Sequence, residues 1–463
     1  MDTGWSHVAD IAAAVREGRV SASAVAADTL TRIARLNPAI NAFTDILKER
    51  ALAKAQAIDQ TRSQGGPLGP LAGVPFAAKN LFDVAGLSTL AGSKINRERA
   101  PATRDATALR RLDAAGAVLV GALNMGEYAY DFTGENVHHG DCRNPHDRSR
   151  MAGGSSSGSA AAVAGGLVPL SLGSDTNGSI RVPSSFCGVF GLKPTYGRLS
   201  RAGTFPFVAS LDHVGPLARS ARDLALAYDV MQGPDTDDPV CADRPVERAT
   251  PLLDTGIAGL RIALAGGYFR AGVFPEVQTA LARVAATLAI KAEIELPQPQ
   301  MARAAAYVIT ASEGAALHLD RLRRRPRDFD PAVRDRLIAG AMIPAALVVK
   351  AQKFRRWYRT RVLELFERWD AVLAPATPCS APALGQQTFV LDKVEMALRP
   401  NIGVYTQPIS FIGLPVVAAP VPVDPLVVAV QVFAAPWRED IALRIAHALE
   451  QMGVAAAPRP PLT

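Results

Sequence analysis

The sequence predicts an α/β fold in which helices cover a central sheet. From Leu71 onward, short apolar strands alternate with helices, the pattern of strand–helix–strand units. The 463 residues are 49% apolar and 20% charged, which is the composition of a folded globular chain of one large domain or two ordinary ones. A chain of this size buries about three quarters of its unfolded surface, so its core needs neither disulfides nor a metal.

The N-terminal region, residues 1–60, is expected to be helical. Apolar residues recur at helical spacing over 25–36, and Ser21 is a candidate N-cap. Asn37-Pro38 is expected to end this helix, because proline cannot donate the next backbone hydrogen bond.

The rest of the chain is expected to form one domain with the N-terminal region. Its parts are a core at 71–220, a helical insertion or subdomain at 260–370 after a polar connection, and a C-terminal part at 371–463 that completes the sheet. The expected elements are a strand at 73–78, a helix at 106–115, a strand at 118–122, a short helix at 160–164, and strands at 167–172, 260–265 and 371–374.

Composition excludes several classes of function. The net charge of +7 is spread too thinly over 463 residues to indicate nucleic-acid binding. No membrane span is expected, and charged residues interrupt the start of the chain too early for a secretory signal. Four scattered cysteines fit reduced thiols. We therefore expect a cytoplasmic protein that acts neither on membranes nor on nucleic acid.

Two loops rich in glycine and serine, at 153–159 and 173–179, flank a short helix and a strand. Either loop alone is most simply a turn, and neither a P-loop nor a dinucleotide-binding pattern is present. Together, however, they bring Ser155 and Ser179 to the same edge of a sheet. Lys79, one of only nine lysines among fifty basic residues, ends an apolar strand. Burial would lower its pKa and make it a candidate general base for a serine.

Segments in and around these loops follow a known pattern. They are Gly153-Gly154-Ser155-Ser156, Gly173-Ser174-Asp175-Thr176-Asn177-Gly178-Ser179-Ile180-Arg181-Val182-Pro183, Phe186-Cys187-Gly188 and Gly191-Leu192-Lys193-Pro194. The pattern resembles the amidase signature family, as do the segments 75–80 and 435–438. The resemblance spans most of the chain and implies a mixed β-sheet covered by helices on both faces.

The resemblance also implies a catalytic triad without a cofactor or metal. Ser179 would be the nucleophile, Ser155 the bridging serine on a cis peptide after Gly154, and Lys79 the base. The oxyanion would be held by the backbone N–H groups of Thr176, Asn177, Gly178 and Ser179.

Two residues depart from the family pattern. Ser157 and Asn177 stand where glycines are common. Asparagine tolerates a left-handed backbone better than other non-glycine residues, so the oxyanion turn can still form, but the Asn177 side chain is expected to narrow the acyl pocket. Asp175 and Arg181 flank the nucleophile, and an internal ion pair is favoured over contact with substrate.

Four segments, at 80–97, 172–183, 205–216 and 309–331, resemble members of the family that remove terminal ammonia from a small carboxylated biuret. This likeness implies a small anionic amide substrate, urea-1,3-dicarboxylate as product, and a small companion subunit in a heterotetramer; a homodimer is the other assembly considered. In the loop 124–136, the candidate substrate contacts are Tyr128, Tyr130 and Asp131, although both tyrosines could simply pack the loop.

Other functions stay open at this stage. They are the glutaminase subunit of a tRNA-dependent amidotransferase, with the arginines at 321–327 and 353–361 facing tRNA or a partner, another small-amide amidase, and an inactive scaffold. No metal is expected, because the spacing of His138, His139, Cys142 and His146 matches no common zinc pattern.

Overall fold

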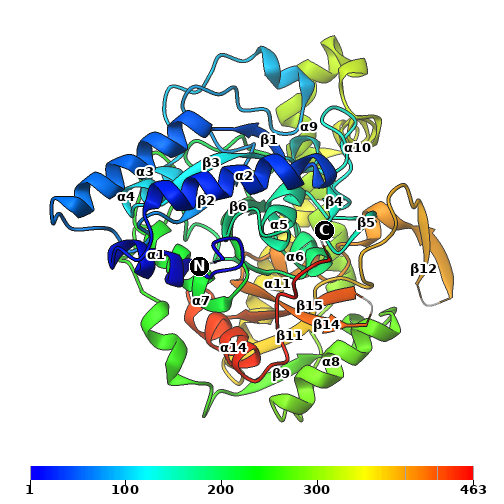
Figure 1. Ribbon diagram of the computed structural model, residues 1–463. Helices are drawn as coiled ribbons and strands as arrows, with labels where there is room; N and C mark the ends of the chain where they lie inside the picture. The colour runs from blue at the N-terminus through cyan, green and yellow to red at the C-terminus, as the bar shows by residue number, and fades with distance from the viewer. Residues whose placement is uncertain (1, 392, 425, 462–463) are drawn as a thin grey trace.

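The computed structural model describes residues 2–391, 393–424 and 426–461. Within these residues a mixed, eleven-stranded sheet crosses the molecule (Figure 1). In sheet order its strands are β1 (Phe43–Ile46), β3 (Val118–Leu123), β2 (Pro75–Lys79), β6 (Leu170–Asp175), β8 (His213–Ala218), β7 (Phe190–Lys193), β14 (Val416–Val423), β15 (Leu426–Ala434), β11 (Ala371–Pro375), β9 (Ile262–Ala265) and β10 (Glu293–Ile294).

Helices cover both faces of this sheet, which confirms the predicted fold class. One group contains α5 and α6, which contact each other and pack on β6 and on β14 with β15, respectively. A second group is built around α7, which contacts α1, α4, α14 and the strand β8. The helices are α1 (Val8–Arg16), α2 (Ala22–Ile40), α3 (Lys48–Ser63), α4 (Thr107–Ala114), α5 (Ser157–Ala164), α6 (Arg181–Cys187), α7 (Ala221–Met231), α8 (Pro275–Thr287), α9 (Pro299–Arg324), α10 (Pro331–Ala341), α11 (Ala345–Leu365), α12 (Leu398–Asn401), α13 (Gln407–Ser410) and α14 (Glu439–Gln451).

The helix α2 does not end at Asn37-Pro38 as predicted. It continues through Pro38 to Ile40, and Asn41 then takes a left-handed conformation. The reason lies in the side chain of Asn37, whose Oδ1 accepts the backbone N–H groups of Ala42 and Phe43 at 2.8 Å each. This side chain satisfies donors just beyond the helix, so the proline sits within the last turn instead of ending it.

The strand β6 lies three residues further along the chain than predicted. Leu167 and Val168 form a turn after α5, in which both backbone N–H groups donate to the carbonyl of Ala162. The strand therefore begins at Leu170 and extends to Asp175. The strand β6 pairs in parallel with β2, and Leu172 lies opposite Ala78. The last residues of β6 therefore lie beside the C-terminal end of β2.

The proline-rich C-terminal segment forms β14 and β15, a long antiparallel pair that the sequence did not predict as strands. Pro420 and Pro422 lie in β14, which would ordinarily argue against a strand inside a sheet. On its other side, however, β14 pairs with β7 only over Val416–Ala418. The prolines follow this stretch, where no second neighbour needs their missing N–H.

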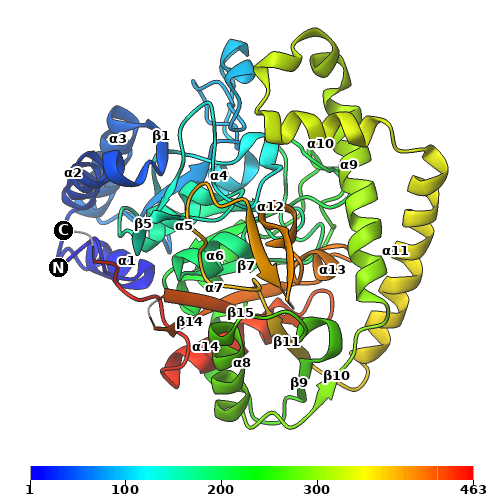
Figure 2. The ribbon, with the colours of Figure 1, turned by 90° about the vertical axis from the view of Figure 1, so that its right-hand side faces the viewer.

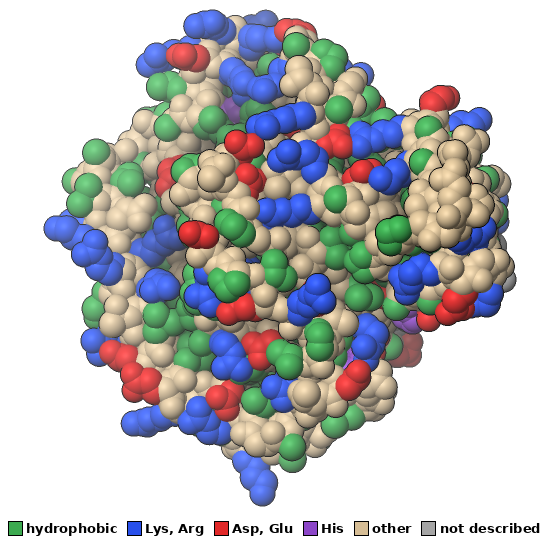
Figure 3. All heavy atoms as spheres, turned by 90° about the vertical axis from the view of Figure 1, so that its left-hand side faces the viewer, with side chains coloured by type: hydrophobic (Ala, Val, Ile, Leu, Met, Phe, Trp, Pro, Cys, Tyr) green, Lys and Arg blue, Asp and Glu red, His purple; other side chains and the backbone are tan. Residues whose placement is uncertain are grey.

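The arginine-rich helices α9 and α11 pack against each other, and α9 also packs against α10, at one side of the sheet, seen at the right of Figure 2. The same figure places both chain termini on the opposite side. Small hairpins lie outside the main sheet, β4 (Arg143–Asn144) with β5 (Asp147–Met151) and β12 (Thr388–Leu391) with β13 (Val394–Ala397). Acidic and basic side chains are intermixed on the face shown in Figure 3. Within the described ranges, no helix is long and apolar enough to span a membrane.

Candidate active site

Lys79 stands at the centre of the site, at the C-terminal end of β2. Its side chain is fully buried. Its Nζ lies within hydrogen-bond distance of three serine hydroxyls, those of Ser155 at 2.7 Å, Ser174 at 2.9 Å and Ser156 at 3.0 Å. Ser174 comes from the neighbouring strand β6, while Ser155 and Ser156 come from the loop before α5.

The environment of Lys79 removes much of its charge at neutral pH. Burial lowers its pKa to about 7, although the negative charges of Asp175, Asp212 and Asp131 act in the opposite direction. Near pH 7, a large fraction of Lys79 is therefore a neutral amine that can accept a proton from a hydroxyl group.

Ser155 lies on a loop that is held by backbone hydrogen bonds. The peptide bond between Gly154 and Ser155 is cis, as the family resemblance implies. The N–H of Gly154 donates to the carbonyl of Phe132 at 2.9 Å. The next residue, Ser156, donates its N–H to the carbonyl of Ser179 at 3.2 Å, so the two glycine-serine loops are directly joined.

A buried ion pair holds the turn that carries Ser179. Asp175 accepts two hydrogen bonds from the guanidinium of Arg181, both at 3.0 Å, and one from the N–H of Ile180 at 3.1 Å. Neither charged side chain is exposed to solvent. Burial raises the pKa of Asp175, but the Arg181 guanidinium, together with Lys193 and His213, outweighs burial and holds this pKa below its usual value. The favoured interpretation of Asp175 and Arg181 as an internal pair thus agrees with the structure.

The turn itself depends on Gly178. Its φ of 141° is unfavourable for other residues, and a Cβ there would lie 2.3 Å from Thr406 Oγ1. Thr406 donates that hydroxyl to the carbonyl of Asn177 at 2.6 Å. Asn177 does not use the left-handed backbone that asparagine tolerates, because Gly178 provides the positive φ of the turn.

Four consecutive N–H groups of this turn, at residues 176–179, have no acceptor among the described residues. They precede the N-terminus of α6, which carries a partial positive charge. A negatively charged oxygen would satisfy several of these donors at once.

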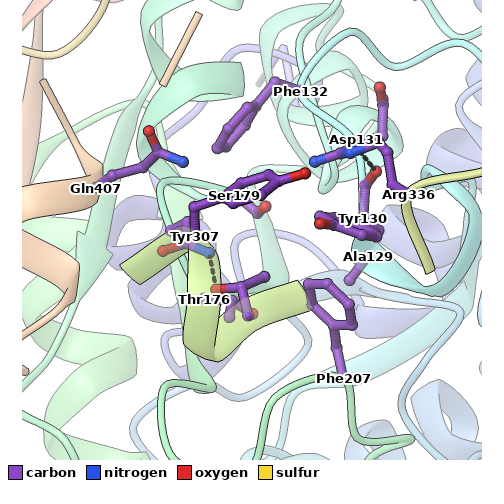
Figure 4. Close-up of a pocket in the computed structure, with 12 residues that line it drawn as sticks. Ala129, Tyr130, Asp131, Phe132, Thr176, Ser179, Phe207, Tyr307, Arg336 and Gln407 are labelled. Atoms are coloured by element: carbon purple, nitrogen blue, oxygen red, sulfur yellow. Dashed lines mark hydrogen bonds between the residues drawn. The ribbon is translucent and has the colours of Figure 1, made fainter. Parts of the chain in front are cut away.

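Ser179 lines a narrow cavity of about 20 Å³ between loops at the edge of the sheet and the helices α9, α10 and α13. Figure 4 shows Tyr130, Tyr307 and Arg336 around Ser179, with Phe207 and Gln407 further out. The lining residues are Ala129, Tyr130, Asp131, Phe132, Thr176, Asn177, Ser179, Phe207, Tyr307, Thr310, Arg336 and Gln407. The cavity is small, and more than half of its lining residues carry polar or charged side chains other than tyrosine.

The three predicted substrate contacts are placed differently from one another. Tyr130 and Asp131 line the cavity, but Tyr128 does not. The ring of Tyr128 packs 4.0 Å from that of His318, the packing role that the sequence left open. Asp131 is held by Arg399 at 2.8 Å and by backbone N–H groups, so its carboxylate has little capacity left for a substrate.

Sequence reasoning missed Arg336, the cation of the cavity. Its guanidinium lies 3.5 Å from the centre of the Tyr130 ring and donates to the Tyr130 carbonyl at 2.8 Å. Within the described ranges it forms no ion pair with a carboxylate. No local pattern distinguishes Arg336 from the other arginines of this region, since only the packing of α10 brings it to Ser179.

The histidines and cysteine that were considered as a metal cluster do not gather. His138 Nε2 contacts Glu127 at 2.9 Å, whereas His146 Nε2 contacts the carbonyl of Cys187 at 3.1 Å. Among the described residues, no three His, Cys, Asp or Glu side chains are placed to hold a metal ion.

Comparison with known proteins identifies the family. Residues 24–443 match the amidase family. The chain belongs to this family. As an amidase, the protein is an enzyme that hydrolyses amides.

Two groups of relatives bear on the substrate of this amidase. The chain is 54% identical to AtzE, a 1-carboxybiuret hydrolase subunit of Pseudomonas sp. (strain ADP), over 96% of this chain and 98% of the relative. It is 38% identical to a glutamyl-tRNA(Gln) amidotransferase subunit of Chromohalobacter salexigens, over 96% of this chain and 95% of the relative.

Two solved structures share the fold of this chain. One belongs to a vestigial protein complex that reveals the origins of an s-triazine catabolic enzyme; it has a TM-score of 0.97, 53% identity, and coverage of 98% of this chain and 100% of the other. A 6-aminohexanoate cyclic dimer hydrolase complexed with substrate has a TM-score of 0.87 and 27% identity, with 99% of each chain covered.

Replacing Asp175 with Asn tests the role of the buried ion pair. The substitution leaves the Arg181 charge without its carboxylate partner in the interior, and we expect the free energy of unfolding to fall by about 3–5 kcal/mol. Equilibrium unfolding in urea measures this loss. The control is Asp335→Asn, which breaks a partly exposed pair with Arg334 and should cost less than about 1 kcal/mol. Equal losses in the two variants would contradict a special role for the buried pair.

Proposed function

We propose that this amidase removes the terminal ammonia of 1-carboxybiuret and yields urea-1,3-dicarboxylate, using Ser179 as nucleophile, Ser155 as bridge and Lys79 as base. The observation that carries the chemistry is the fully buried Lys79 amine 2.7 Å from the Ser155 hydroxyl, on a loop bonded to that of Ser179. The 54% identity to a 1-carboxybiuret hydrolase subunit supports the choice of substrate.

In the proposed reaction, neutral Lys79 accepts a proton from Ser155, which takes one from Ser179 as the latter attacks the terminal amide carbonyl. The free N–H groups of residues 176–179 stabilise the oxyanion, and loss of one such donor typically costs about a hundredfold or more in rate. Lys79 and Ser155 then return the proton to the leaving ammonia. Water hydrolyses the remaining acyl-enzyme by the same proton path.

The cavity provides a site for the carboxylate of this substrate. Arg336 has no carboxylate partner among the described residues and lies in the same cavity as Ser179. A planar guanidinium can hold a carboxylate by two parallel hydrogen bonds. We therefore assign to Arg336 the binding of the substrate carboxylate, at the end opposite to the amide that is cleaved.

We further propose that the protein works with a small companion subunit in a heterotetramer, with a homodimer as the alternative assembly. The relative of 54% identity is itself described as one subunit of its enzyme, and the solved structure of 53% identity comes from a protein complex.

A second candidate function is the glutaminase subunit of a tRNA-dependent amidotransferase, which the 38% identity to such a protein favours. One of the arginines expected to face tRNA, Arg325, is instead paired with Glu98 and Asp328. Release of ammonia from glutamine, with no turnover of 1-carboxybiuret, would select this second function.

Ammonia release from the purified chain tests the proposal most simply. We expect turnover of 1-carboxybiuret, with or without a co-expressed small subunit, to exceed that of glutamine, malonamide and an aryl amide. Ser179→Ala and Lys79→Met should each lower kcat by at least about a thousandfold, as typical for members of a catalytic triad. Their melting temperatures should stay close to that of the wild type. Near-normal kcat in either variant would contradict the assigned roles.

The pKa of Lys79 predicts the pH dependence of the reaction. Below about pH 7 the amine is protonated and cannot accept a proton, so kcat/KM should rise with pH and level off above this value. Burial also lowers the pKa of Lys193 to about 7, but its Nζ contacts the carbonyls of Leu414 and Pro194. The pH profile of kcat/KM in Lys193→Met should therefore keep its inflection near pH 7. A flat profile between pH 6 and 8 would refute the role of Lys79.

Replacing Arg336 with Gln tests the carboxylate contact. We expect kcat/KM for 1-carboxybiuret to fall by about ten- to a hundredfold, because a charge-assisted hydrogen bond is lost. The same quantity for biuret, which lacks the carboxylate, should change little. Arg334→Gln, on the same helix but paired with Asp335, is the matched control. An equal effect of Arg336→Gln on both substrates would assign Arg336 a structural role instead.

A further inference from the structure

Only one of the two polar atoms in the buried side-chain amide of Asn177 has a hydrogen-bond partner among the described residues. Its side chain lines the cavity of Ser179, and only 7% of the residue is exposed. The Nδ2 group donates to Thr310 Oγ1 at 2.8 Å. The Oδ1 atom is buried and has no hydrogen-bond donor among the described residues. Because buried polar atoms are almost always paired, an acceptor left open in a cavity wall needs an explanation.

The surrounding contacts hold this amide in place. Thr310 belongs to α9, on the other side of the cavity from the nucleophile turn, and is itself buried. The backbone carbonyl of Asn177 is fixed by the Thr406 hydroxyl. Gln407, another polar residue of the cavity, accepts from Arg303 at 2.9 Å. The open Oδ1 is thus part of a fixed wall two residues before Ser179.

We propose that Asn177 Oδ1 accepts a hydrogen bond from the substrate N–H adjacent to the carbonyl that Ser179 attacks. Asn177 is thereby a specificity residue that selects ureido amides, which carry nitrogen next to this carbonyl, over amides that carry a methylene group there. The inference rests on the proposed function for the position of the scissile carbonyl. It adds the feature that separates biuret-like compounds from ordinary aliphatic amides such as glutamine.

The physical basis of this selection is the difference between a paired and an unpaired buried acceptor. A ureido N–H satisfies Oδ1, whereas a methylene group fills the same space and leaves Oδ1 unpaired and shielded from water. Sites built to bond a substrate N–H discriminate strongly against the analogue that lacks it. Biuret and malonamide form such a matched pair, because they differ only in having NH or CH₂ between the two carbonyls.

The test compares biuret and malonamide as competitors of the turnover of 1-carboxybiuret. In the wild type, biuret should bind about tenfold or more tightly than malonamide. Asn177→Gly keeps the backbone N–H but removes the acceptor, and should bring the ratio of the two inhibition constants close to one. Thr310→Val, which frees the Asn177 amide, should lower the same ratio. Ser157→Gly is the matched control, since it also replaces a polar residue by glycine close to the site but outside the cavity lining, and should keep the wild-type ratio.

Several outcomes would overturn the inference. They are an unchanged ratio in Asn177→Gly, equal binding of the two compounds to the wild type, and competition by neither compound. An amide turned the other way, with Nδ2 toward the substrate, would bind the carbonyls of both compounds alike and give equal binding. If the melting temperature shows that Asn177→Gly does not fold, the ratio of the two inhibition constants in Thr310→Val decides instead. If 1-carboxybiuret is not hydrolysed, the proposed function fails separately, and the ratio is measured against whichever amide the enzyme hydrolyses.

Discussion

The burial of one amine, Lys79, among three serine hydroxyls is the constraint on which the site depends. The parallel pairing of β2 with β6 places Ser174 beside Lys79, and the loop before α5 adds Ser155 and Ser156. A lysine that stayed charged in this position would be costly to bury. Burial therefore favours the neutral form, for which three hydroxyls are suitable hydrogen-bond partners.

Two opposing effects set the pKa of Lys79. Burial lowers its pKa, while the carboxylates of Asp175, Asp212 and Asp131 oppose this effect, and the balance lies at about 7. Asp175 has a second function, because its pair with Arg181 and its bond to Ile180 fix the turn of Ser179. One carboxylate thus connects the geometry of the turn that carries Ser179 to the charge of Lys79.

The local part of this architecture could be predicted from the sequence. The glycine-serine loops indicated that Ser155 and Ser179 reach one sheet edge, and the apolar strand before Lys79 indicated a buried lysine, because strand ends and turns are encoded by neighbouring residues. Their grouping into one triad came from the family resemblance. The strand β14 and its partner β15 were missed, since the two prolines of β14 are tolerated only where β14 lacks a second partner.

The outer wall of the cavity could not be predicted in the same way. Arg336 and Thr310 come from α10 and α9, and nothing in their own segments indicates that these helices pack over Ser179. Tyr128 and Tyr130 illustrate the same limit, since they are two residues apart and only Tyr130 reaches the cavity. The residues expected to perform the chemistry thus stand in segments with a recognisable local pattern, whereas those expected to set specificity do not and reach the cavity only through helix packing.

A nuclear magnetic resonance titration of the lysine side chains tests the central claim most directly. With only nine lysines in the chain, isotope labelling at the ε carbon gives few signals, and the one missing from the Lys79→Met variant identifies Lys79. The account predicts that this signal titrates near pH 7 in the folded protein. A signal that titrates near pH 10, like those of exposed lysines, would contradict the neutral base and with it the proposed mechanism.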